Sequence, residues 1–362
     1  MSDFPTEVLG PSGFQQADFE RITQLVVSEF QVEESLLEQG MPTYYLIWPQ
    51  ETKLAFLRLL KKLDEQKLIA FLRKNNKRVV LRVVAKPTVK PSNPAIYWAL
   101  FIATVATTFI TGYYSFQSGG MNPLVSGAVF SAAIMTVLGL HEMGHKLTAN
   151  KEKVEATSPY FIPGPPPLGT LGAVIMQKSL PPNRDALFDI GANGPIAGFI
   201  IALIFSAVGL TLLVPTTVSG AEGTLPLIPI SWNILMPILQ NLSLIPPLTG
   251  TNNAWSLHPI TWAGWAGMVV TMLNLLPAAM LDGGHVAKSL VPDKFRYILT
   301  IASVALLVFS GPEFLVFAFI VVFMSFFRHP GPLDDVSGIS TRRKLETVAL
   351  VAIFLLAFPL RA

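Results

Sequence analysis

Five consecutive residues, His141-Glu142-Met143-Gly144-His145, carry the strongest chemical signal in the sequence. In a helix, residues four apart lie on one face, so both imidazoles can bind a single zinc ion while Glu142 serves as general base toward an attacking water. The chain has only five histidines, and a chance HExxH pattern among so few has a probability of roughly a few in a thousand. The pattern predicts a hydrolytic zinc centre.

A catalytic zinc also needs a third protein ligand. The chain has no cysteine, so that ligand has to be His, Asp or Glu. We predict Asp282, within the stretch Asn274 to His285 that reads NLLPAAMLDGGH. His285, one turn later, is the alternative ligand, or else a partner of the ligands. Pro277 removes a helical hydrogen bond and Gly283-Gly284 loosens the next turn, which predicts irregular backbone lining a polar cavity.

These residues lie in a chain composed like a membrane protein. Of 362 residues, 51% are hydrophobic and only 14% charged, with a mean hydropathy of +0.51, whereas soluble chains are about a quarter charged. We predict a polytopic α-helical membrane protein of about seven transmembrane helices, preceded by a small N-terminal soluble α+β domain. The expected spans are Ala95–Tyr113, Leu124–His145, Ala186–Val214, Ile260–Val286, Tyr297–Ser310, Phe314–Phe327 and Leu345–Leu360.

The histidine motif ends the second span, which sets its depth. From Pro123 to His141 the rise is about 27 Å, just inside a hydrocarbon core of about 30 Å. A His/Glu motif on the wet face of a soluble helix can arise by accident, but at membrane depth such groups are costly and normally functional. The second and fourth spans run in the same direction, so Asp282 is expected at the level of the histidines.

Basic residues predict the orientation. They occur in Lys146 to Arg184 and Lys288 to Arg296 but not in Ser115 to Pro123 or Pro215 to His258. Basic loops are retained in the cytoplasm, so we expect a multi-pass protein of the cell membrane with a cytoplasmic N-terminus. The net charge of +3 and pI near 9.0 reflect this topology and contact with the lipid bilayer. No nucleic-acid partner is expected, because the chain lacks an aromatic and basic face.

The chain is expected to divide near residue 90. Residues 1–90 form the cytoplasmic α+β domain, and 91–362 form the membrane domain, with the zinc core at about 124–290. Periodicity predicts helices and strands in the first part. The helices are Phe14–Val27 and Glu51–Gln66, and the strands are Thr43–Trp48, Leu68–Arg73 and Arg78–Val84.

Several other residues have two interpretations. Asn274 is either a hydrogen-bond donor that faces the substrate or a polar residue that packs helices. The small residues around Asn193 predict close packing of the third span.

Thr170–Met176 predicts a short hairpin near the zinc, which serves either as an edge for a substrate strand or as a lid. His258 and His329 are expected on surfaces away from the zinc, and Ile228–Ile238 on the outer membrane surface.

The two motifs together resemble those of the site-2 protease family of intramembrane zinc metalloproteases. HEMGH on one span is followed by N-x-x-P-x-x-x-x-D-G on another, over roughly Ala95 to Pro332. The closest resemblance is to prokaryotic and plastid members that carry LDGGH and lack a PDZ domain. It implies His141, His145 and Asp282 as ligands of one Zn²⁺, Glu142 as the catalytic base and Asn274 as a polar group near the substrate. It assigns no role to the N-terminal domain.

The predicted activity is a zinc-dependent metalloendopeptidase that cuts peptide bonds in or near transmembrane helices of membrane-protein substrates. The alternative is an ion or metal transporter that uses the His/Glu/Asp cluster as a relay, although the other spans offer few polar residues for a pore. A zinc-binding scaffold without activity is the third hypothesis, and the presence of Glu142 argues against it.

Overall fold

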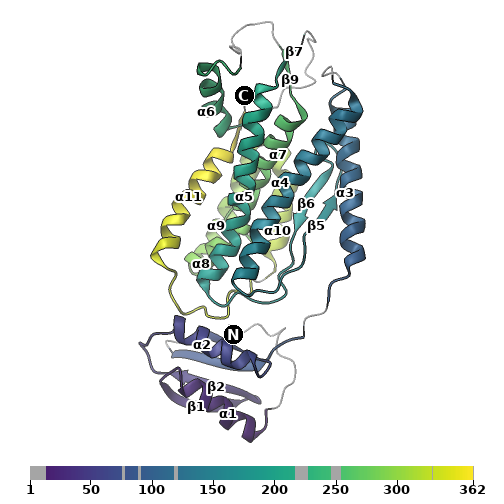
Figure 1. The fold of residues 1–362 in the computed structure, drawn as a ribbon. Helices are drawn as coiled ribbons and strands as arrows, with labels where there is room; N and C mark the ends of the chain where they lie inside the picture. Colours follow the sequence, from purple (N-terminus) through teal and green to yellow (C-terminus); the bar gives the residue numbers. More distant parts are fainter. Residues whose placement is uncertain are drawn as a thin grey trace.

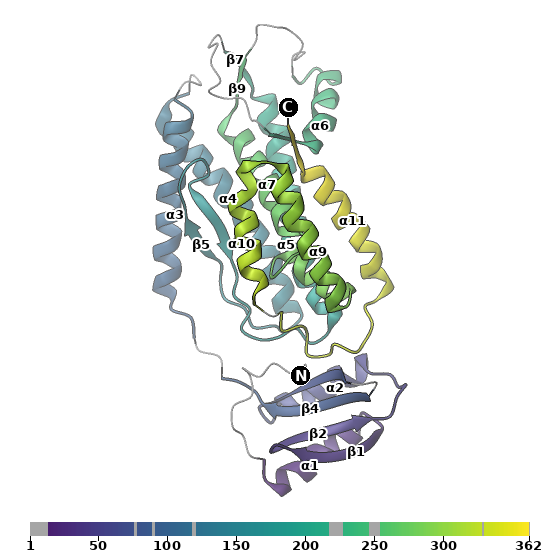
Figure 2. The same ribbon diagram turned by 180° about the vertical axis from the view of Figure 1, so that it is seen from behind.

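The computed structural model describes residues 14–75, 78–88, 91–117, 121–216, 227–245, 254–327 and 329–361. A small α+β domain lies below a bundle of long helices (Figure 1). The bundle is elongated along its helices (Figure 2). This arrangement confirms the predicted helical protein with a small N-terminal α+β domain.

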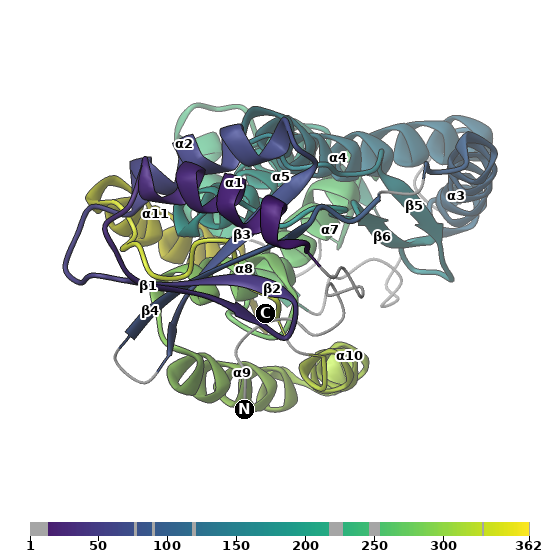
Figure 3. The ribbon, with the colours of Figure 1, turned by 90° about the horizontal axis from the view of Figure 1, so that it is seen from below.

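The N-terminal domain is a four-stranded antiparallel sheet with two helices. Its elements are α1 (Gln16–Val27), β1 (Val32–Glu38), β2 (Met41–Leu46), α2 (Lys53–Asp64), β3 (Leu68–Asn75) and β4 (Arg78–Ala85). The strand order is β1-β2-β4-β3, and α1 and α2 lie side by side (Figure 3). Ile22, Phe56 and Leu72 are fully buried in its core. Strand β1 was not predicted, because VEESLLE is an acidic and mostly exposed edge strand.

The bundle contains three helices that are long and apolar enough to cross a membrane in the part of the chain that the structure describes. They are α3 (Pro94–Ser115), α4 (Pro123–Lys151) and α5 (Arg184–Thr211). They match the first three predicted spans. The α4 helix begins at Pro123 because Asn122 caps it, its side chain accepting a hydrogen bond from the Leu124 amide at 2.9 Å.

The four remaining predicted spans are shorter or more polar helices. The fourth is interrupted, with α7 (Pro259–Leu275) ending before Pro277 and α8 (Asp282–Leu290) beginning at the predicted ligand. The bundle is completed by α9 (Asp293–Ser310), α10 (Leu315–Ser325) and α11 (Thr341–Ala357). A transmembrane count of seven is therefore not confirmed. The seventh predicted span ends early, because Pro359–Arg361 forms strand β10 and pairs with β8 (Leu227–Pro229).

A β-hairpin lies beside α3. Strand β5 (Tyr160–Pro163) pairs antiparallel with β6 (Thr170–Val174), and both lie between α3 and α10 in the view from behind (Figure 2). The ring centroids of Tyr97 on α3 and Tyr160 lie 4.4 Å apart, and those of Phe101 and Phe161 lie 5.5 Å apart. The predicted hairpin is confirmed, although its first strand begins ten residues earlier than the sequence pattern indicated.

The far end of the bundle carries α6 (Ile230–Asn241) and two short strand pairs, of which β7 (Val214–Thr216) and β9 (Ala254–Ser256) form one (Figure 1). Trp232 on α6 is 1% exposed, so the helix packs against the protein, while Ile234 and Ile238 are exposed. The predicted outer loop Pro215–Pro259 lies partly outside the described residues.

One extended segment joins the N-terminal domain to the bundle. We call residues 329–340 the strap. The amide of Leu72 in β3 donates to the carbonyl of Leu333 at 2.9 Å, and the amide of Leu333 donates to the carbonyl of Pro181 at 2.8 Å. The strap therefore continues the sheet beyond its β3 edge. Leu333 is 4% exposed and packs in the core of the N-terminal domain, so a residue far beyond position 90 contributes to that core. The division of the chain near residue 90 stays a prediction.

Candidate metal centre

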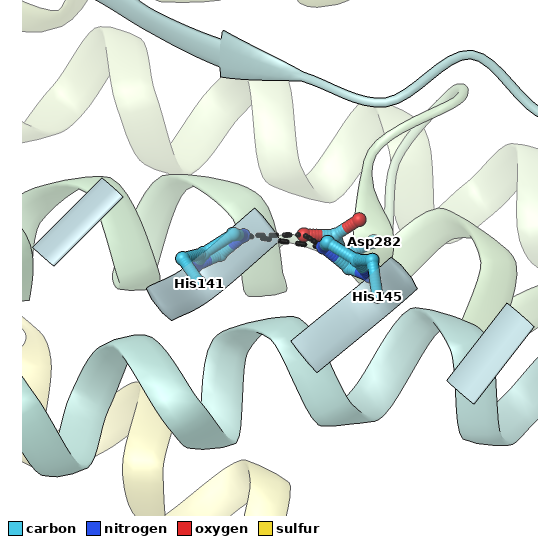
Figure 4. Close-up of side chains that lie close together, drawn as sticks. All are labelled: His141, His145 and Asp282. Atoms are coloured by element: carbon cyan, nitrogen blue, oxygen red, sulfur yellow. Dashed lines mark hydrogen bonds and ion pairs between the residues drawn. The ribbon is translucent and has the colours of Figure 1, made fainter. Parts of the chain in front are cut away.

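Three predicted ligands meet in the interior of the bundle. The Nε2 atoms of His141 and His145 lie 3.2 Å apart, and each lies 3.2 Å from Oδ2 of Asp282. Figure 4 shows the two imidazoles on one side of α4 pointing toward the carboxylate. His141 is 2% exposed and His145 is 8% exposed. These residues form the only such group of metal-binding side chains among the residues described.

The three donor atoms have the separation that a tetrahedral zinc site requires. Zinc–nitrogen and zinc–oxygen bonds are about 2.0–2.2 Å, so adjacent ligand atoms of a tetrahedron lie about 3.3–3.6 Å apart. The observed triangle of 3.2 Å edges is close to one face of that tetrahedron, and a fourth position is left for water or substrate. The donor set of two imidazoles and one carboxylate fits a catalytic zinc.

The tautomer of His145 is set by the backbone of α5. Its Nδ1 lies 2.6 Å from the carbonyl oxygen of Ile190. A carbonyl only accepts, so Nδ1 carries the proton and Nε2 is left with its lone pair toward the ligand cluster. The hydrogen bond also prevents rotation of the ring.

Two glycines of α5 make room for the imidazoles. A Cβ at Gly194 would lie 2.1 Å from Nε2 of His145, and a Cβ at Gly198 would lie 2.7 Å from Nδ1 of His141. Close packing through small residues was predicted around Asn193. The side-chain amide of Asn193 donates to the hydroxyl of Thr148 on α4 at 2.9 Å. The glycines allow the backbones of α4 and α5 to approach with both rings between them.

Asp282 reaches the histidines because the chain breaks just before it. Pro277 has no amide hydrogen, and the residue before a proline avoids the helical region. Leu276 is accordingly extended, and Ala279 has a positive φ of 48°. The prediction that Gly283-Gly284 loosens the helix was wrong, since both are helical. They permit contact with the end of α7 and the loop after it instead, because a Cβ at Gly283 would lie 2.2 Å from the carbonyl oxygen of Leu275 and a Cβ at Gly284 would lie 2.5 Å from that of Ala278.

Two more predicted residues border the cluster. Glu142 is 5% exposed and interacts with the backbone amide of Ile175, directly after β6. The Asn274 side-chain nitrogen, at the end of α7, lies 3.3 Å from Nε2 of His141. Both side chains also line a cleft. Asn274 therefore lies beside the ligands, where its amide can contact either a ligand or a substrate.

The cleft beside the cluster has a volume of about 650 Å³. It is lined by the predicted ligands His145 and Asp282, by Leu171, Ala173 and Val174 of the hairpin, and by Phe317 and Ile320 of α10. Phe71 in the N-terminal domain also contributes to its wall. The space therefore extends from the ligands between β6 and α10 toward the domain.

Sequence reasoning missed the position of His329. It was expected on the surface, but its Nε2 lies 2.7 Å from Nδ1 of His285, and both rings line the cleft. The signal was present in the HPGP turn, in which the Gly331 amide donates to Nδ1 of His329. His258, in contrast, accepts from the amide of Ile260 and caps α7 at the opposite end.

The sequence matches one family of known proteins. A family described as Peptidase family M50 matches residues 129–310. The chain is 29% identical over 66% of its length to the probable zinc metalloprotease EGY1, chloroplastic, of Arabidopsis thaliana, and 30% identical over 75% of its length to the EGY2 protein of that plant. The matches cover 44% and 50% of those relatives, so the chain spans about half the length of the curated relatives it matches. No solved structure matches.

Proposed function

Because the chain belongs to peptidase family M50, we propose that it is a zinc-dependent metalloendopeptidase that hydrolyses peptide bonds in or near transmembrane helices of other membrane proteins. The observation that carries the proposal is the triangle of His141, His145 and Asp282 donors beside the buried carboxylate of Glu142. The names of the matched relatives, which are probable zinc metalloproteases, support the same chemistry.

His141, His145 and Asp282 would hold one zinc ion per chain. When bound, zinc supplies Lewis-acid polarisation of the scissile carbonyl and lowers the pKa of water at the site. Glu142 accepts the proton of the attacking water and returns it to the leaving amine. Its place on α4, one residue after His141, keeps the carboxylate in the cleft without making it a ligand. Asn274 contacts the substrate from the end of α7.

The substrate segment is proposed to bind as an extended strand along β6. A transmembrane helix has its carbonyls in internal hydrogen bonds, so it must unwind before a peptide bond can reach the ligands. Among the described residues, strand β6 pairs with β5 alone. Leu171, which is 70% exposed, and Val174 line the cleft. Because the substrate helix must unwind to bind in this way, substrates are expected to carry residues that weaken a helix, such as Gly, Pro or Asn, near the cleavage site.

The side of the membrane is part of the proposal. We place the N-terminal domain and the loop from Lys146 to Arg184 on the side that retains basic residues, which in a cell membrane is the cytoplasm. Because the chain has no cysteine, single cysteines introduced at Lys151 and at Asn241 can be labelled with an impermeant reagent. Labelling at Asn241 but not at Lys151 from outside intact cells is expected, and the opposite pattern would reverse the topology.

The activity is tested with purified protein and a transmembrane peptide that carries a Gly-Pro pair in its helix. Wild type should cut it, and Glu142→Gln should cut it about 10² to 10⁴ times more slowly while keeping its zinc. His258→Asn, which keeps a capping side chain far from the cleft, should cut it at the wild-type rate. Cleavage by Glu142→Gln at the wild-type rate would refute the mechanism. Movement of metal ions or protons across sealed vesicles, lost in Glu142→Gln, would favour the transporter.

A further inference from the structure

His285 and His329 form a hydrogen-bonded pair that the proposed mechanism does not use. The Gly331 amide donates to Nδ1 of His329 at 3.0 Å, and Nε2 of His329 lies 2.7 Å from Nδ1 of His285. Burial lowers the pKa of His329, and the nearby His285, Arg296 and Lys288 lower it further, so this ring is neutral. A neutral imidazole has one donor and one acceptor. His329 must therefore donate from Nε2, and His285 accepts at Nδ1.

The direction of these bonds leaves His285 with a free donor. Since its Nδ1 accepts, its own proton is on Nε2. Within the described part of the chain, Nε2 of His285 has no hydrogen-bond partner, and the half-buried ring lines the same cleft as Glu142 and Asp282. Gly191 on α5 lets His285 approach closely, because a Cβ at position 191 would lie 3.0 Å from Cβ of His285. The pair thus presents one N–H group with a fixed orientation.

The strap that carries His329 is held from two sides. Toward the bundle, Nζ of Lys288 on α8 lies 3.4 Å from Asp335 and 3.1 Å from Asp293. Toward the N-terminal domain, Leu333 is buried in the domain core, and the Asp335 amide donates to the carbonyl of Leu72 at 3.1 Å. His329 is four residues before Leu333, so the segment that carries it contacts both the bundle and the N-terminal domain.

We propose that Nε2 of His285 donates a hydrogen bond to a backbone carbonyl of the unwound substrate segment, and that His329 is a positioning residue for His285. The proposal rests on the proposed peptidase function. An unwound segment at membrane depth has carbonyls without partners, and each costs free energy until a donor meets it. Strand addition at β6 serves some of them, and His285, which lines the same cleft, serves another. His285 is not a ligand in this scheme, because His141, His145 and Asp282 already supply three protein donors and the fourth position is needed for water or substrate.

The experiment measures binding and turnover separately with the Gly-Pro transmembrane peptide. His285→Phe should raise KM, and should raise the Kd for the peptide in the Glu142→Gln background, by about 3- to 10-fold, the usual value of one hydrogen bond. His285→Gln, whose amide can still donate, should recover most of the affinity. His329→Phe should raise KM in the same direction but add nothing in the His285→Phe background. His258→Asn is the histidine control.

Zinc per chain and thermal unfolding are measured on every variant. The double variant His285→Phe with His329→Phe removes both polar partners together, so it tests the proposal even when a single variant misfolds. The inference is overturned when folded His285→Phe, or that double variant, binds the peptide as wild type does, or when His285→Phe loses its zinc. A wild type that does not cut the peptide would instead refute the peptidase function, and the inference with it.

Discussion

The N-terminal domain and the helix bundle distribute polar and apolar side chains in opposite ways. In the domain, Phe56 and Leu72 are fully buried, while the ion pair of Arg21 with Asp18 lies at the surface. In the bundle, Phe309 is 88% exposed, whereas His141 and Glu142 are only 2% and 5% exposed. One region is arranged for water and the other for lipid. In the bundle, the buried polar residues are therefore the ones to examine for chemistry.

The two interiors are also packed differently. The core of the domain is filled by large side chains such as Ile22 and Tyr44, whereas the bundle places glycines against the rings of His141 and His145. Shortening a large side chain in the domain core leaves a cavity. Adding a methyl group at one of these glycines in the bundle displaces a histidine ring. The predictions below test this difference.

The largest effect is expected from removing two of the three donors. His141→Ala combined with Asp282→Ala leaves only His145, and one imidazole does not retain a catalytic zinc. The zinc content of the purified protein, measured per chain, should fall from one to near zero, and cleavage should be lost. His258→Asn should keep its zinc. Full zinc content in the double variant would show that the ligands lie elsewhere.

A single added methyl group in the bundle should have the next largest effect. In Gly194→Ala the new Cβ would lie 2.1 Å from Nε2 of His145, so the ring must move, and a displacement of about 1 Å costs about 10²-fold in rate. Gly139→Ala on α4 is the matched control, because its Cβ would be 3.8 Å from the nearest side chain, Phe161. Cleavage rates of the two variants are compared, and equal rates would refute the packing argument.

Shortening one side chain in the strap tests whether the stability of the N-terminal domain affects the activity of the bundle. Leu333→Ala removes a buried side chain from the domain core, which typically costs about 2–5 kcal/mol. Leu36→Ala, at an exposed position of β1, should change stability by about 0.5 kcal/mol or less. Urea unfolding followed by limited proteolysis of the domain provides the measurement. Loss of stability in the domain without any change in cleavage would show that the strap does not couple the regions.

The smallest effect concerns pH. A hydrogen bond from Lys62 at 2.6 Å and another from Arg58 at 2.7 Å lower the pKa of Glu29 below its usual value, although burial opposes them. A carboxyl group with a lowered folded-state pKa adds stability above its unfolded pKa, and this is lost as pH falls through the folded value. Glu29→Gln should flatten the decline of domain stability at acid pH. An unchanged acid profile would contradict this assignment.

Some structure followed directly from the sequence and some did not. The third predicted span corresponds to the single helix α5, but the fourth corresponds to two helices, α7 and α8, with Pro277 in the loop between them. Pro277 correctly indicated that the helix breaks. The glycines did not mark the extent of the break, because Gly283 and Gly284 lie inside α8. Strand β1 had no signal, because an exposed edge strand needs no apolar alternation.

The sequence by itself determined which residues can do the chemistry. HEMGH puts two imidazoles and a carboxylate on one helix by spacing alone, and composition places that helix in a membrane protein. Only the tertiary structure decided that Asp282 lies 3.2 Å from both Nε2 atoms, that glycines of α5 admit the rings, and that His329 meets His285 across 44 residues. Periodicity reports contacts within one element, whereas contacts between distant elements depend on packing, which no local pattern encodes.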